Sequence, residues 1–171
     1  MDSGAVEGVY QDFRELKECL AGDPSGQVAL ERIYPKALLL AAASHLEHLT
    51  TAQILALFDD FRMPTLRIFV ERRAIKRQYH TLFQWGNPGS AGTLFSLFGD
   101  DCKRRFDARR RADDEFASWV DAFLHIGTAR NQLVHNNYAD FRLDNTAEEI
   151  FDLYQKARNF PLRIRELVHD S

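Results

Sequence analysis

The sequence predicts an all-α fold, arranged as one domain over all 171 residues. Apolar residues recur at helical spacing along almost the whole chain, and no segment shows the alternation that is typical of a β-strand. Hydrophobic residues make up 45% of the chain and charged residues 27%, a balance that supports a packed core. We therefore expect a bundle of about four or five main helices with a few short helices between them.

The first two helices are expected on either side of a break rich in Gly and Pro at residues 22–26. An apolar stripe predicts a helix over about residues 5–20. The next helix is rich in Ala and Leu over residues 37–49, and Pro35 fits its first turn or a kink. This helix extends toward Phe61, and Thr50-Thr51 is the place where it would break.

The middle of the chain alternates short helices with a marked turn. Pro64 suits the start of a third helix, and the stretch at residues 85–92, WGNPGSAG, is a strong turn signal. A short helix around residues 94–98 follows it.

The last third of the chain predicts two longer helices. Acidic residues at 113–115 suit the positive end of a helix that runs to about residue 135. A final helix is expected to start at Asn145, with Glu148 completing a capping box, and to kink at Pro161.

Charge is divided unevenly along the chain, although the formal net charge is only -3. Residues 62–111 hold 12 Lys or Arg against four acidic residues, a local charge of +8, and the rest holds 10 basic and 21 acidic residues. Such a basic segment attracts a polyanion such as RNA, or it forms solvated helix faces; both interpretations stay open. The candidate RNA-binding residues are Arg72, Arg73, Lys76, Arg77, Lys103, Arg104, Arg105, Arg109, Arg110 and Arg111.

The stretch RNQLVHNN at residues 130–137 carries the strongest chemical signal. Residues five apart on a helix are separated by roughly 140° around its axis, so Arg130 and His135 are not stacked on one another. Asn131 is the neighbour of His135 one turn back. This spacing suggests a site shared across a two-fold interface, where two copies of the motif would meet.

The residue types suit metal-independent RNA cleavage. The negative end of a helix favours the protonated form of His135, and the Arg130 guanidinium makes forked hydrogen bonds to phosphate oxygens. Together they would support attack by the 2′-hydroxyl of the RNA, which needs proton transfer and charge stabilisation but no metal or other cofactor. An Arg or a His near a helix end is also a common structural cap, so the spacing alone leaves that alternative open.

Three motifs in order resemble the HEPN superfamily, and more narrowly its RiboL-PSP type. They are the helix ALLLAAASHLEHL with its central Glu47, the turn QWGNPGSAGTLFSLFG, and the terminal RNQLVHN. The resemblance covers about residues 30–160. It implies an all-α bundle, usually a homodimer with a composite cleft, and a metal-independent endoribonuclease of prokaryotic defence or toxin systems.

The resemblance also implies a role for each matching residue. His135 would be the catalytic acid or base, Arg130 the phosphate binder, and Asn131 a positioning group. Glu47 would orient Arg130 through a salt bridge. A homodimer partner, RNA, and an antitoxin or other defence-system partner follow as expectations, and the alternative is a non-catalytic HEPN module that binds nucleotides or RNA or serves dimerisation.

One departure concerns the family members that are silenced by modification of a Tyr two residues after the His. Here Asn137 holds that place and Tyr138 comes third, which weakens the case for such regulation.

Other candidate sites are weaker. His45 and His48 could share a helix face, but the sequence offers no third metal ligand. Trp85 and Phe95 could stack on bases or belong to the core. His80 and His125 suggest structural roles, although His125 could also lie near the cleft, because it precedes the motif on the same helix. The absence of an apolar run of about 20 residues and of a basic signal-peptide start leads us to expect a cytoplasmic protein.

Overall fold

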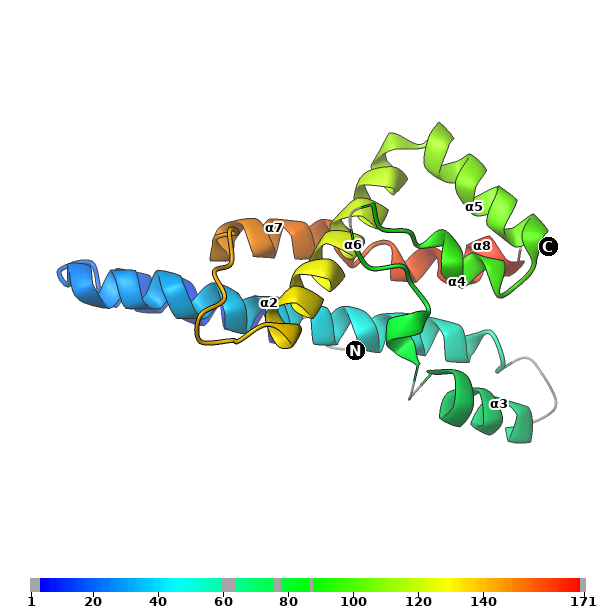
Figure 1. The fold of residues 1–171 in the computed structure, drawn as a ribbon, viewed down its shortest axis with the longest axis horizontal. Helices are drawn as coiled ribbons and strands as arrows, with labels where there is room; N and C mark the ends of the chain where they lie inside the picture. Colours follow the sequence, from blue (N-terminus) through cyan, green and yellow to red (C-terminus); the bar gives the residue numbers. More distant parts are fainter. Residues whose placement is uncertain (1–3, 60–63, 76–77, 87, 170–171) are drawn as a thin grey trace.

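The computed structural model describes residues 4–59, 64–75, 78–86 and 88–169, and every regular segment in these ranges is a helix (Figure 1). The only extended pairing in the same ranges is an isolated bridge between Gln84 and Ser90. The predicted all-α class is therefore confirmed.

The first two helices, α1 (Gly4–Cys19) and α2 (Pro24–Ala56), form a long hairpin. The Asp23 side chain accepts a hydrogen bond from the Ser25 backbone N–H, and Pro24 occupies the first turn, where no backbone N–H is needed. Of the two places predicted for Pro35, the first turn is wrong, because Pro35 lies buried inside an α2 that has already begun. The helix also continues past Thr50, whose hydroxyl donates to the Leu46 carbonyl at 2.8 Å, and it ends before Phe61, which lies outside the described residues.

Short helices fill the middle of the chain. They are α3 (Pro64–Val70), a π-helical turn at Glu71–Ile75, a 3-10 turn at Tyr79–Thr81, and α4 (Gly92–Ser96). Helix α3 begins at Pro64 as predicted, and the expected turn lies between the 3-10 turn and α4, with its Asn87 outside the described residues.

The second half of the chain begins with α5 (Asp100–Ala112) and α6 (Asp114–His135), and Asp113 caps α6 by accepting from the Phe116 N–H. Helix α7 (Ala147–Ala157) begins later than predicted. The capping box is formed by Thr146 and Glu149 instead of Asn145 and Glu148, because the Thr hydroxyl is the side chain that reaches the N–H three residues on. After α7 the chain passes through a 3-10 turn at Pro161–Arg163 into α8 (Ile164–His169).

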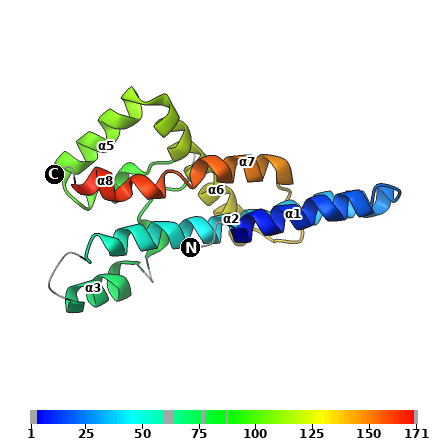
Figure 2. The same cartoon turned by 180° about the vertical axis from the view of Figure 1, so that it is seen from behind.

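Helix α6 crosses α2 and connects the parts of the core (Figure 1). It packs against α2, α5 and α7, and α8 packs against α2 and α5. Aromatic rings fill the junction: Phe123 of α6 lies 5.0 Å from Phe83 and 5.0 Å from Phe160, centroid to centroid. The view from behind shows α1 lying along the N-terminal half of α2, while α7 and α8 run beside its length (Figure 2). The C-terminal end of α6 is thus held over the middle of α2.

Among the helices of the described ranges, none is both long and apolar enough to cross a bilayer.

Candidate functional site

The motif at the end of α6 borders a cavity of about 420 Å³ between α2 and α6. The 3-10 turn at residues 79–81 and the turn that follows it close one side. Its size suits a small-molecule or nucleotide ligand. We call it the motif cavity, and its lining residues are Ala43, Leu46, Glu47, Tyr79, His80, Trp85, Phe123, Ile126, Gly127, Arg130, Asn131 and His135.

All three candidate residues of the motif line this cavity from one chain. Arg130 and Asn131 are half-buried, and His135, the last residue of α6, is exposed. Arg130 and His135 border the two edges of a helix face whose middle carries Gly127 and Asn131, since positions four apart are neighbours on a helix. The separation of roughly 140° therefore does not require a second copy of the motif, and the homodimer stays a prediction of the resemblance.

Glu47 lines the same cavity from α2, but its expected salt bridge to Arg130 is not formed. Within the described ranges neither an ion pair nor a hydrogen bond joins the two side chains. The Arg130 guanidinium instead donates to the Asn131 amide oxygen at 3.1 Å. Asn131 thus acts on the orientation of Arg130 directly, and the Glu47 carboxylate remains on the cavity wall.

The end of α6 is fixed by Asn136. Its side-chain amide donates to the Gln132 carbonyl at 2.6 Å, and its backbone N–H reaches the same oxygen at 3.1 Å. The backbone of Asn136 is extended, with φ -97° and ψ 167°. This double contact stops the helix directly after His135 and keeps the imidazole at the mouth of the cavity.

Two further cavity residues, Tyr79 and His80, were not predicted as site residues. Burial raises the pKa of the Tyr79 hydroxyl; a hydrogen bond with Thr50 opposes this rise, Glu47 adds to it, and Arg130 opposes it. Its hydroxyl therefore stays protonated at neutral pH. His80 is exposed on the same wall. Nothing in the spacing of the sequence links residues 79–80 to residue 130, because the short turns that bring them together carry no strong periodic pattern.

Trp85 forms the aromatic wall of the motif cavity. Its indole N–H donates to the His80 carbonyl at 2.8 Å, so its polar atom is already bonded. A Cβ atom placed on Gly127 would lie 2.0 Å from the six-membered ring of Trp85. The indole can occupy this place only because residue 127 has no side chain. Of the two aromatic residues considered for base stacking, Trp85 is half-buried at the cavity, whereas Phe95 is fully buried in the core.

The predicted RNA-binding residues fall into two groups. Arg72 and Arg73 are exposed on the π-helical turn, which leads within a few residues to Tyr79 at the cavity. Lys76 and Arg77 lie outside the described residues. The described part of this group is therefore the exposed arginine pair at 72 and 73.

The remaining candidates lie on α5, which packs on the N-terminal half of α6 (Figure 1). Most of them face carboxylates: Lys103 pairs with Asp107, Arg104 with Asp101, Arg109 with Glu166 and Asp113, and Arg110 with Asp121. Arg105 is half-buried and Arg111 is exposed. The net positive charge of α5 is thus largely compensated by neighbouring acids.

A second cavity, of about 610 Å³, lies on another face of α6. Arg110, His125, Gln132 and Arg142 line it, and the His125 ring hydrogen-bonds to the Asn145 side chain at 3.1 Å. His125 therefore has a structural partner and is separated from the motif cavity. This arrangement makes His125 a matched control for His135 on the same helix.

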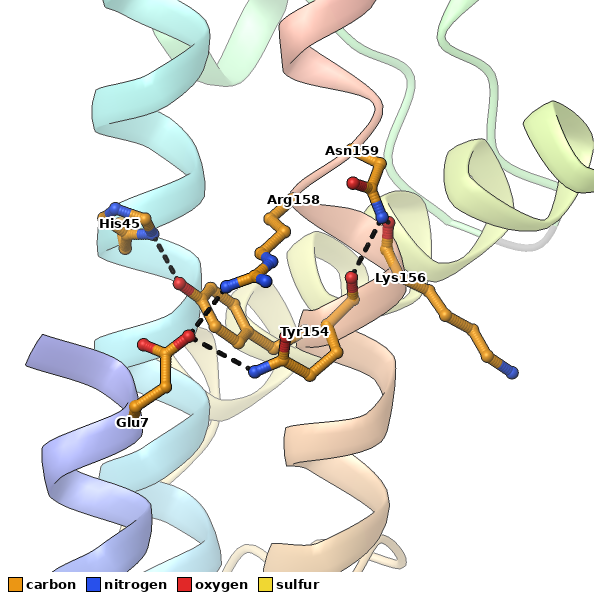
Figure 3. Close-up of polar contacts among 7 residues, drawn as sticks. Glu7, His45, Tyr154, Lys156, Arg158 and Asn159 are labelled. Atoms are coloured by element: carbon orange, nitrogen blue, oxygen red, sulfur yellow. Dashed lines mark hydrogen bonds and ion pairs between the residues drawn. The ribbon is translucent and has the colours of Figure 1, made fainter. Parts of the chain in front are cut away.

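His45, one of the two histidines considered as metal ligands, has a protein partner. The His45 ring hydrogen-bonds to the Tyr154 hydroxyl at 2.8 Å, on the side of α2 that faces α7 (Figure 3). Across the described ranges, His, Cys, Asp and Glu side chains form no group of three that could hold a metal ion.

The segment after the motif is fastened to α2. The Lys36 ammonium donates to the Tyr138 carbonyl at 2.7 Å and lies 4.9 Å from the centre of the Tyr138 ring. The chain leaving His135 therefore runs back along α2 before α7 begins.

No protein-family model, curated protein or solved structure matches this chain. The site rests on its own geometry and chemistry.

Proposed function

We propose that the protein is a metal-independent endoribonuclease of the HEPN type. It cuts RNA in the motif cavity, where a 2′-hydroxyl of the RNA attacks the adjacent phosphate. The observation that carries the proposal is that Arg130, Asn131 and His135 line one cavity of a single chain. A helix end with an Arg and a His would equally serve as a cap. Here, however, Asn136 performs the capping, which leaves Arg130 and His135 to the cavity.

In the proposed reaction the 2′-oxygen of a ribose bonds to the adjacent phosphorus as the bond from phosphorus to the 5′-oxygen breaks. One proton leaves the 2′-hydroxyl and one is taken up by the departing 5′-oxygen; His135 carries out one of these two transfers and water the other. Arg130 binds the non-bridging oxygens and stabilises the charge that develops on them, and Asn131 holds the guanidinium in place. The products carry a 2′,3′-cyclic phosphate and a 5′-hydroxyl.

The expected setting is prokaryotic defence or a toxin system in the cytoplasm, with RNA as substrate and a second copy of the chain as partner. The homodimer would place two motif cavities near one another. An antitoxin or other defence-system partner would control the activity.

The test is incubation of single-stranded RNA with the purified protein in EDTA. We expect cleavage with cyclic-phosphate ends by the wild type and by His125→Ala, and a loss of roughly 10²- to 10⁴-fold for His135→Ala. Arg130→Lys keeps the charge but loses the forked geometry, so it should retain little activity.

Equal cleavage by wild type and His135→Ala would point to a contaminating nuclease and end the proposal. Absence of cleavage together with tight RNA binding would support the binding module instead.

A further inference from the structure

We infer that the motif cavity contains a guanine-binding subsite, in which the base stacks on Trp85 and the Glu47 carboxylate accepts hydrogen bonds from its Watson–Crick edge. The inference rests on the proposed function for the position of the phosphate, at Arg130 and His135. The base subsite itself stands on Trp85 and Glu47, which line the same cavity.

The first step concerns Glu47. It lies on the cavity wall from α2, and its carboxylate makes no ion pair or hydrogen bond to any described residue. The role implied by the resemblance, which was to orient Arg130 through a salt bridge, is not seen, because the Arg130 guanidinium donates to Asn131 instead. A carboxylate on a cavity wall without a protein partner is a hydrogen-bond acceptor for a ligand.

The second step concerns Trp85. Its ring is held by the bond from its N–H to the His80 carbonyl at 2.8 Å and by contact with Gly127. Neighbouring rings fix it further, with Phe83 at 5.1 Å and Phe123 at 5.9 Å between centroids. Because the polar atom is already used, Trp85 offers the cavity aromatic carbon, which is the surface on which unpaired bases stack.

The third step is the choice of base. A carboxylate accepts two parallel hydrogen bonds when two N–H donors lie side by side, and guanine presents such a pair on its Watson–Crick edge, at N1 and the 2-amino group. The edges of adenine, cytosine and uracil each place an acceptor beside the donor, and this acceptor would repel the carboxylate. Sites that bond a substrate's polar groups in this way reject analogues that lack them.

The binding test needs no cleavage. The chain has two Trp residues, and Trp119 lies outside both cavities, so Trp119→Phe leaves Trp85 as the only indole reporter. We titrate this variant with the 3′-monophosphates of guanosine, adenosine, cytidine, uridine and inosine and follow Trp fluorescence. Guanosine 3′-monophosphate should bind at least about tenfold more tightly than the others, inosine included, because each charge-assisted hydrogen bond contributes roughly 10- to 100-fold.

Glu47→Gln on this background should reduce guanosine binding to the level of adenosine. The matched control is Asp121→Asn, an exposed acid of α6 that lines the second cavity, and it should keep the preference. Equal binding of all five nucleotides, or a guanosine preference that survives Glu47→Gln, overturns the subsite. The inosine comparison uses the unchanged cavity and holds even if the Glu47 variant folds poorly.

The subsite and the nuclease fail in distinguishable ways. Guanosine preference without RNA cleavage supports the subsite and ends the nuclease proposal. RNA cleavage at all four bases with equal efficiency overturns the subsite and leaves the nuclease intact.

Discussion

Two polar clusters on different sides of α2 differ in how completely their groups are paired. His45 and Glu47 are two positions apart, which turns them about 200° from one another around the helix axis. His45 belongs to a cluster with α1 and α7, and Glu47 faces the motif cavity. The hydrogen bonds within each cluster show which of the two stabilises the fold.

In the first cluster most of the polar groups bind one another (Figure 3), and the exception is the second carboxylate oxygen of Glu7, which is buried without a partner. Arg158 donates to Glu7 at 2.7 Å, Gln155 reaches the same carboxylate oxygen at 3.3 Å, and Tyr154 meets His45 at 2.8 Å. In the motif cavity the described contacts of Glu47, Arg130 and His135 reduce to the single bond between Arg130 and Asn131. Buried polar groups that satisfy each other hold a fold together, whereas groups left on a cavity wall are available to a ligand.

The strongest test of this comparison applies one substitution to both clusters. His135→Ala should remove cleavage by roughly 10²- to 10⁴-fold and change the free energy of unfolding by less than about 0.5 kcal/mol, because the side chain is exposed. His45→Ala should do the reverse and lower stability by about 1–3 kcal/mol, since Tyr154 loses a hydrogen-bond partner in the interior. RNA cleavage and urea unfolding measure the two effects, and the comparison breaks if both variants lose activity and stability alike.

The next largest effect concerns the aromatic wall. Gly127→Ala should destabilise the protein by about 1–3 kcal/mol and change the Trp85 fluorescence, because the new methyl group meets the indole ring. Gly8→Ala is the control, since nothing lies within 4 Å of its Cβ position on α1, and it should stabilise the helix by about 0.5–1 kcal/mol. If urea unfolding shows the same change for both variants, then Trp85 is not packed against α6.

A smaller effect is expected from the two exposed arginines of the π-helical turn. Arg72→Glu with Arg73→Glu should weaken single-stranded RNA binding and lower the salt slope by about 0.7 for each phosphate that the variant no longer neutralises. Arg111→Glu, an exposed change on α5, should alter the slope less, because α5 lies toward the other end of α6. Binding measured across a salt series decides the matter; equal slopes for both variants would contradict the assignment.

The smallest effect is on stability against pH. Burial lowers the pKa of His45 below its ordinary value of 6.5, and the charges of His48 and Arg158 add to this while Glu7 opposes it. Above pH 6.5 the ring is neutral in both the folded and the unfolded chain, so the contribution of His45 to the free energy of unfolding is fully present. As the pH falls below 6.5, the unfolded chain takes up a proton first and stability declines until the folded pKa is passed.

Urea unfolding of wild type and His45→Gln at pH 7.5 and at pH 5.5 measures this contribution. The wild type should lose more stability than the variant over this interval. An identical loss in both proteins would show that His45 does not contribute.

The sequence was sufficient for the helices that carry strong periodic patterns and caps. Helix α6 begins at the acidic residues and ends at His135 as predicted. The wrong helix starts are those for which two nearby residues fit the same position. Pro24 and Pro35 both suit a first turn, and Thr146 and Asn145 both suit an N-cap. Tertiary packing chose between them.

The sequence predicted the motif residues of the candidate site, but it did not predict which other residues line the cavity. Arg130, Asn131, His135 and Glu47 meet at one cavity, but Tyr79, His80 and Trp85 reach it through short turns whose path follows from packing. The paired charges of α5 illustrate the same limit, because Arg110 meets Asp121 from another helix. A count of basic residues cannot separate compensated charges from free ones.

Gly127 stands three positions before Arg130 and has consequences for how such cavities are recognised in other chains. A protein that kept Arg, Asn and His at this spacing, but carried a side chain at the place of Gly127, could not hold an indole where Trp85 lies. The informative pattern is therefore Gly-x-x-Arg-Asn-x-x-x-His together with an upstream Trp-Gly turn. Chains with the shorter motif alone would keep the phosphate end of the cavity and lose the wall on which a base can rest.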